Sequence, residues 1–116
     1  MKHNIAIIMG GFSSEAAISL KSGQVVFQHL PKEIYAAYCI HISKEKWVYM
    51  APNGEEFPIN MSDFSVAING EIIHFDCVFN AIHGAPGEDG FMQAYFELLD
   101  IPHSSCGMYQ AALTFN

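Results

Sequence analysis

The chain has 116 residues, 51% hydrophobic and 15% charged, which fits one compact domain and is too apolar for a disordered chain. The net charge of −7, with five Lys and Arg in total, argues against nucleic acid and against an anionic membrane surface as partners. Three cysteines at wide spacings form neither a disulfide framework nor a CxxC metal pair, which favours reduced thiols.

The first predicted element is a strand that is buried on both faces of a parallel sheet. A continuous apolar run, Ile5–Met9, ends at Gly10 and Gly11. This run is too short for a signal-peptide core or a membrane span, so we expect a cytoplasmic protein. Ser13 or the following serine offers a helix N-cap, and a helix is predicted over Ser14–Leu30, before a proline.

The middle of the chain predicts short strands with antiparallel pairing. Asn69-Gly70 is a strong two-residue hairpin signal, and turn residues also separate the second and third of these strands. The predicted strands are Tyr38–Ile42, Trp47–Met50, Phe57–Ile59, Ser65–Ile68 and Glu71–Phe75.

The last part of the chain repeats the order of strand, glycine-rich turn and helix. Cys77–Ile82 is a second short apolar run, and the turn His83–Gly90 leads into a helical pattern that ends at Leu99. Ile101–Ser105 predicts a short connection or edge strand, and Met108–Phe115 predicts the beginning of another helix.

Two strand-turn-helix units predict an α/β fold: an open, mainly parallel sheet flanked by helices, Rossmann-like, with a β-hairpin excursion. With no internal repeat or linker, residues 1–116 are predicted to form one domain. Ligands of such sheets lie beyond the carboxyl ends of the strands, so we expect the two glycine-rich turns to neighbour each other.

Glu15 is the first candidate site residue. On a helical wheel it falls within about 20° of Val26, which would point a carboxylate towards the interior or a cleft. A buried carboxylate needs a cationic or hydrogen-bonding partner, so Glu15 is a candidate anchor for a substrate ammonium group. The alternative is an acid in the first helical turn that interacts with the helix dipole.

His83 is the second candidate, because it ends an apolar strand and opens a glycine-rich loop, where α/β folds place reactive side chains. The alternative is a hydrogen-bonded structural histidine. Glu88 either caps the following helix or orients His83. Glycines allow positive φ and close approach of a ligand, and those of the two loops are Gly10, Gly11, Gly84, Gly87 and Gly90.

Other kinds of site are not supported by the sequence. Neither loop matches the GxGxxG or GxxxxGK pattern, and no lysine follows either loop to meet a phosphate, so the chain by itself is not expected to bind ATP well. No His and Cys cluster predicts a metal site, and no GxSxG motif predicts a hydrolase nucleophile.

Two segments together resemble D-alanine-D-alanine ligases of the ATP-grasp class. The opening segment, Met9–Glu15 followed by Ile18–Gly23, resembles the first motif of that family. The segment from Asn80 to Gly90, with the helix up to Pro102, resembles its HGxxGEDG motif. The tail from Gly107 resembles the segment that leads into the family's central ATP-binding domain, whereas Lys44–Phe75 matches loosely.

The resemblance implies a function in peptidoglycan synthesis. The family uses ATP, with magnesium or manganese, to phosphorylate the carboxylate of one D-alanine, and the amine of a second D-alanine then attacks the acyl phosphate. Glu15 would hold the ammonium of the first D-alanine, Ile18 would line the pocket for its methyl group, and His83 with Gly84 would lie near its carboxylate. The ATP and metal contacts of the family belong to later domains, so the 116-residue chain by itself is expected to be inactive.

Two alternatives remain open at the level of the sequence. A D-alanine-D-lactate ligase shares both motifs and differs in a loop outside this chain. A non-catalytic α/β binding or dimerisation module would use the same sheet to pair with a partner. The family pairs through this domain, so the resemblance also implies a homodimer.

Overall fold

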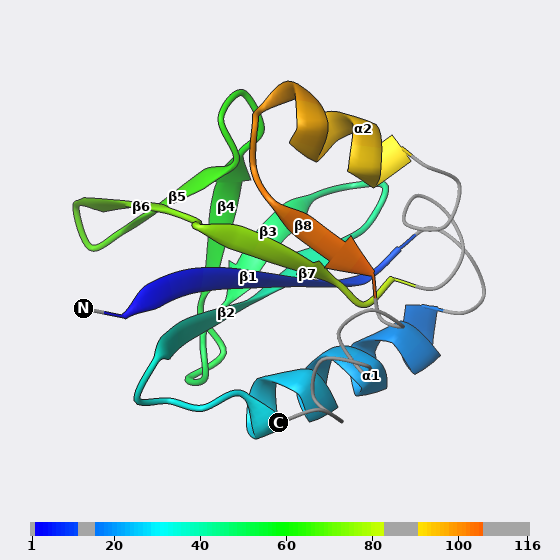
Figure 1. Cartoon of the computed structure of the whole chain (residues 1–116), viewed down its shortest axis with the longest axis vertical. Coiled ribbons are helices and arrows are strands. Elements are labelled where there is room, and N and C mark those ends of the chain that lie inside the picture. The colour runs from blue at the N-terminus through cyan, green and yellow to red at the C-terminus, as the bar shows by residue number, and fades with distance from the viewer. Residues whose placement is uncertain (1, 12–15, 83–90, 106–116) are drawn as a thin grey trace.

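The computed structural model describes residues 2–11, 16–82 and 91–105, which form an eight-stranded sheet and two helices. The strand order is β6-β5-β4-β3-β2-β1-β7-β8, and the sheet lies between α1 and α2 (Figure 1). The elements are β1 (His3–Gly10), α1 (Ala16–His29), β2 (Tyr35–Ile42), β3 (Trp47–Met50), β4 (Glu56–Asn60), β5 (Ser65–Ile68), β6 (Glu71–His74), β7 (Cys77–Asn80), α2 (Phe91–Leu98) and β8 (His103–Ser105).

The predicted α/β class is confirmed, but the expectation of a mainly parallel sheet is wrong. β2, β1, β7 and β8 pair in parallel, whereas the four pairings from β2 through β6 are antiparallel. Short turns cause this difference, because they can join antiparallel neighbours but cannot make the long crossover that parallel strands need. The chain therefore forms a mixed sheet, and the parallel half of this sheet contains β1 and β7, the strands of the two strand-turn-helix units.

β1 is the centre of the parallel half and is covered on both faces. Its side chains alternate between two buried clusters: Ile7 packs with residues of α1 and β2, and Ile8 packs with residues of α2 and the antiparallel strands. Both side chains are fully buried. The apolar run at the start of the chain is thus the signature of a strand with no solvent-facing side.

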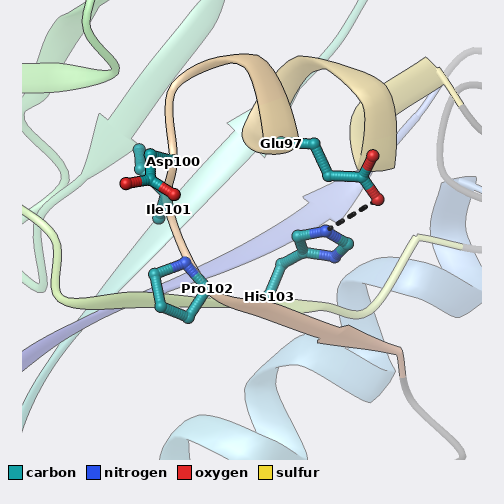
Figure 2. A pocket seen from close by; sticks show the side chains of 5 residues that line it. All are labelled: Glu97, Asp100, Ile101, Pro102 and His103. Atoms are coloured by element: carbon teal, nitrogen blue, oxygen red, sulfur yellow. Dashed lines mark ion pairs between the residues drawn. The ribbon is translucent and has the colours of Figure 1, made fainter.

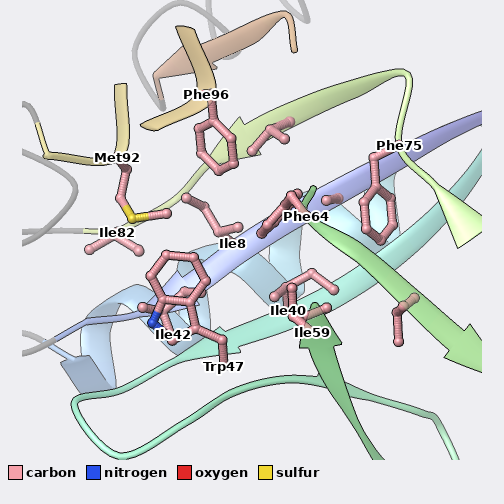
Figure 3. Close-up of a cluster of buried hydrophobic side chains, with 13 residues drawn as sticks. Ile8, Ile40, Ile42, Trp47, Ile59, Phe64, Phe75, Ile82, Met92 and Phe96 are labelled. Carbon is pink, nitrogen blue, oxygen red and sulfur yellow. The ribbon is translucent and has the colours of Figure 1, made fainter. Parts of the chain in front are cut away.

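The antiparallel half curls towards α2, so that the fold is not a simple open sheet. Phe64, just before β5, contacts Phe96 of α2 with ring centroids 4.9 Å apart. Figure 3 shows these rings and Trp47 filling the space between α2 and the strands. The hydroxyl of Tyr95 also donates to the carbonyl of Met61, which ties α2 to the turn between β4 and β5.

α1 approaches β1 through small side chains. Ser19, Gly23 and Val26 face the sheet, at helical spacing, and are buried. The apolar residues Ile18 and Val25 are instead 57% and 54% exposed. A Cβ built on Gly23 would lie 2.9 Å from the Cβ of Met9, so a glycine is what lets the helix lie this close to the strand.

The hairpin signal in the sequence is confirmed. Asn69 and Gly70 have φ of 51° and 85°, the two positive values that a type I′ turn requires, and they join β5 to β6.

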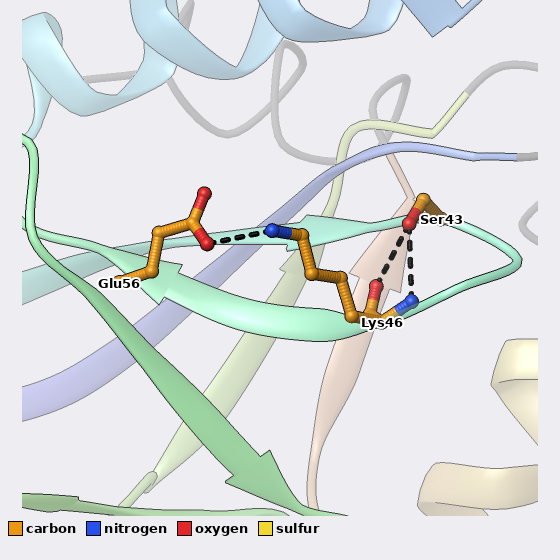
Figure 4. A network of polar contacts seen from close by, with 3 residues as sticks. All are labelled: Ser43, Lys46 and Glu56. Atoms are coloured by element: carbon orange, nitrogen blue, oxygen red, sulfur yellow. Dashed lines mark hydrogen bonds and ion pairs between the residues drawn. The ribbon is translucent and has the colours of Figure 1, made fainter.

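At the β2–β3 turn, the Ser43 hydroxyl donates to the carbonyl of Lys46 at 3.0 Å (Figure 4). Lys46 Nζ lies 2.7 Å from Glu56 Oε1, an exposed ion pair that stabilises the fold by at most about 1 kcal/mol.

Candidate functional site

The candidate site lies at the carboxyl ends of β1 and β7. These strands are parallel neighbours, with Ile5 opposite Cys77 and Ile8 opposite Asn80, so the connections that follow them begin side by side. Several predicted site residues fall on those connections and lie outside the described residues: Ser13, Glu15, His83, Gly84, Gly87, Glu88 and Gly90. The structure describes the strands and helices on either side of these residues.

The exit from β1 is built from two glycines with a left-handed backbone. Gly10 and Gly11 have φ of 97° and 105°. A Cβ on Gly10 would lie 2.7 Å from the carbonyl oxygen of Ile42, which leaves no room for a side chain. The N–H of Gly11 donates to the same carbonyl at 2.8 Å, so the end of β2 holds the beginning of the loop.

Ser19 of α1 connects the exits of β1 and β7. Its hydroxyl accepts a hydrogen bond from the N–H of Gly10 at 2.9 Å and donates one to the carbonyl of Ala81 at 2.7 Å. The side chain is fully buried. Ser19 is not among the site residues predicted from the sequence, although its place four residues before Gly23 and seven before Val26 puts all three on one face of a helix.

The exit from β7 is held by backbone and side-chain bonds. Ala81 donates its N–H to the carbonyl of Ile8 at 2.9 Å, and its carbonyl accepts from Ser19. The next N–H, that of Ile82, donates to Oδ1 of the buried Asn80 at 2.9 Å. Each of these bonds constrains the chain just before His83.

Ile18, predicted to line a substrate pocket, lies on the exposed side of α1 beside Ser19. More than half of its surface is open to solvent, so the described residues do not enclose it. Its role in a pocket stays a prediction.

His41 is a further polar side chain near these strand ends. It lies opposite Met9 of β1, one residue before Ile42, and its buried Nε2 has no hydrogen-bond partner among the described residues. Burial lowers the pKa of this imidazole, and the nearby carboxylate of Glu56 opposes the shift to a smaller degree. The lowered pKa favours a neutral ring.

A pocket of about 400 Å³ lies elsewhere, between α2 and the amino end of β8 (Figure 2). Glu97 and Asp100 contribute carboxylates to it, and His103 Nε2 lies 3.9 Å from Glu97 Oε1. β1, β7 and β8 are parallel, so their amino ends lie at one end of the sheet and their carboxyl ends at the other. The pocket lies at the amino end of β8, whereas Gly10 and Ala81 lie at the carboxyl ends of β1 and β7. It is separate from the candidate site.

Metal and membrane features can be assessed for residues 2–11, 16–82 and 91–105. Within these ranges no three side chains of His, Cys, Asp or Glu converge in a way that could hold a metal ion. Neither helix in the same ranges is long and apolar enough to cross a membrane. The two cysteines in the described part, Cys39 and Cys77, are free thiols.

A family model described as "D-ala D-ala ligase N-terminus" matches residues 4–106 of the chain. The chain belongs to this family. A D-alanine--D-alanine ligase from Flavobacterium johnsoniae is 68% identical over 113 residues, which are 97% of this chain and 35% of that protein. The chain thus spans about a third of the length of the curated relatives it matches.

Solved structures agree with this membership of the ligase family. D-alanyl-alanine synthetase A from Vibrio cholerae superposes with a TM-score of 0.76 at 30% identity, covering 89% of this chain and 31% of that one. A D-Ala:D-Ser ligase from Enterococcus faecalis superposes with a TM-score of 0.75 at 29% identity, covering 89% of this chain and 35% of that one. The ligase N-terminal fold is therefore shared by enzymes named for different second amino acids.

Proposed function

We propose that this chain is the N-terminal, first-substrate part of an ATP-dependent ligase that joins two D-alanines for peptidoglycan synthesis. The observation that carries the proposal is the Ser19 bridge. One hydroxyl bonds the ends of the two strands whose following loops contain Glu15 and His83. The connections that carry these two residues in the sequence then start from one rim of the sheet, where α/β folds bind ligands.

The proposed roles follow from the chemistry of an amino acid. Glu15, as a carboxylate, would pair with the ammonium of the first D-alanine, and Ile18 would contact its methyl group. His83, with the Gly84 backbone, would lie near the carboxylate that becomes activated. The glycines of the two loops would let the backbone approach the substrate closely. Such a half-site works by positioning its substrate for reaction.

The described residues do not themselves fit ATP or a metal ion, since they offer neither a phosphate loop nor a converging ligand set. We therefore assign ATP and magnesium or manganese to the rest of the protein. The 116-residue chain by itself is proposed to be inactive. Location in the cytoplasm and pairing into a homodimer stay predictions.

The second substrate is the point on which the alternatives differ. The similarity to a D-Ala:D-Ser ligase supports the view that this part of the molecule does not select the second substrate. A D-alanine-D-lactate ligase would have the same first-substrate half-site. We favour D-alanine because several curated relatives that match nearly the whole chain are named D-alanine--D-alanine ligase.

A direct assay tests the proposed function. The gene product that carries these 116 residues is incubated with ATP, Mg²⁺ and D-alanine, with or without D-serine or D-lactate, and the products are identified by mass. The expected product is D-alanyl-D-alanine, formed with release of phosphate, in all mixtures. A mixed dipeptide or depsipeptide as the main product would assign a different second substrate, and no ATP-dependent product would refute the ligase function.

A further inference from the structure

Ser19 has a bonding pattern that a structural serine in a helix does not need. Helix formation leaves the side chain free, yet here the hydroxyl uses its single proton on Ala81 and an oxygen lone pair on Gly10. Both partners are backbone groups of other elements. The bonds are fully buried, so water does not take the place of the hydroxyl.

The two bonds connect the segments on which the candidate residues lie. The Gly10–Ser19 bond closes a stretch of sequence that contains Glu15, and the Ser19–Ala81 bond joins residues 62 apart, two positions before His83. The Ser19 hydroxyl therefore adds a second link between the two strand exits, beside the backbone bond from the Ala81 N–H to the Ile8 carbonyl. The backbone at Gly10 also packs closely against the end of β2, because a Cβ there would lie 2.7 Å from the carbonyl oxygen of Ile42.

We propose that Ser19 is a positioning residue that couples the loop of Glu15 to the loop of His83, and so fixes the separation of the groups that hold the two ends of the first D-alanine. This inference rests on the proposed function. An amino acid has its ammonium and its carboxylate on the same carbon, so a site that grips both tolerates little change in spacing. Ser19 acts through the loops and does not itself touch the substrate.

The test compares Ser19→Ala with Ser65→Ala in the gene product that carries this chain. Ser65 is a matched control, because it is also buried and its hydroxyl donates to Asp63 at 2.6 Å, in the antiparallel half of the sheet. For Ser19→Ala we expect the KM for the first D-alanine to rise about tenfold, the size expected for losing a buried hydrogen bond. The KM for ATP should stay within about twofold of the wild-type value, and Ser65→Ala should change neither constant by more than that.

A second variant separates positioning from folding. Ser19→Cys keeps the shape of the side chain, with a larger sulfur that forms weaker hydrogen bonds, so its KM for the first D-alanine should lie between those of the wild type and Ser19→Ala. Equal increases in the KM for ATP and for D-alanine, or no increase in either, would contradict the coupling role. So would unfolding of both Ser19 variants at the assay temperature, which would make Ser19 a core residue. An inactive wild-type protein would instead refute the proposed function.

Discussion

The Ser19 hydroxyl lies 2.7 Å from the carbonyl oxygen of Ala81, although 62 residues separate them in the sequence. This contact brings α1, which follows one glycine-rich loop, against the end of β7, which precedes the other. β1 and β7 are neighbouring strands, so the Ser19 side chain reaches the ends of both without separating them. The arrangement makes the carboxyl ends of β1 and β7 and the first turns of α1 one hydrogen-bonded unit.

Gly10 should be intolerant of a side chain. In Gly10→Ala the new Cβ would meet the Ile42 carbonyl at 2.7 Å and the residue would be held at a φ of 97°. We expect a loss of about 2–4 kcal/mol in the free energy of unfolding, combining left-handed strain with a backbone clash. Urea unfolding of the 116-residue chain measures it.

The control for this variant is Gly54→Ala. Gly54 has a φ of 92°, but a Cβ there would have no atom within 4 Å, so the strain remains without the clash. We expect Gly54→Ala to cost about 1–2 kcal/mol. Equal losses for the two variants would show that the contact with Ile42 contributes nothing to the need for glycine at position 10.

Gly23 should also resist substitution, even though alanine favours helices by about 1 kcal/mol. The new methyl group would overlap the side chain of Met9, whose Cβ, Sδ and Cε all lie within 2.9 Å of it. We expect Gly23→Ala to lower the free energy of unfolding by about 1–3 kcal/mol. The double variant with Met9→Ala should lose less than the sum of the single losses, since the methyl group enters the space that Met9 vacates.

The urea midpoints of the two single variants and the double variant give the coupling energy. A coupling energy of at least about 0.5 kcal/mol is expected for residues in direct contact. A Gly23→Ala variant that is more stable than the wild type would mean that α1 does not lie this close to β1. Gln28→Ala, at an exposed position of the same helix, is the control for propensity effects.

The buried thiol of Cys39 should make the chain lose stability in alkaline solution. Burial raises its pKa to about 11, and weaker effects of Lys32 and of a hydrogen bond from Gln24 oppose the shift. The unfolded thiol loses its proton at lower pH than the folded one, so this contribution is complete below about pH 9 and is lost as pH rises to 11. A shift of this size corresponds to about 2–3 kcal/mol.

Urea unfolding at pH 7, 9 and 11 of the wild type and of Cys39→Ala separates the contribution of the Cys39 thiol to stability from the contributions of the tyrosines. The stability of Cys39→Ala should fall less between pH 9 and 11 than that of the wild type. If the free energy of unfolding changed with pH in the same way for the two proteins, the pKa of Cys39 would be the same in the folded and the unfolded chain. At pH 8, a thiol reagent should modify Cys39 only after urea is added.

Strong local signals in the sequence predicted much of the fold. The apolar run of Ile5–Met9 predicted β1, and Asn69-Gly70 predicted the turn between β5 and β6. Both signals are strong because burial on both faces and positive φ each select few residue types. The start of β2 was predicted three residues late, at Tyr38 instead of Tyr35. Two alanines there give little strand signal, and pairing of Tyr35 with His3 of β1 extends the strand.

Residues whose surroundings depend on distant segments were not predictable in the same way. Ser19 is polar and lies in a helix, so its complete burial depends on backbone partners at the end of β1 and just after β7. Leu98 is apolar but 87% exposed, because α2 contacts the core through Met92 and Phe96. The roles of Glu15, Ile18 and His83 stay predictions.

The most direct test of the central claim is the dependence of ligase velocity on D-alanine concentration for the wild type, Glu15→Gln and Glu33→Gln of the gene product. Glu33 is the matched control, an exposed acid between α1 and β2. Removing the charge that pairs with the ammonium should raise the KM for the first D-alanine by about tenfold or more in Glu15→Gln, and leave it unchanged in Glu33→Gln. Equal KM values for all three proteins would contradict the claim that this chain holds the first D-alanine.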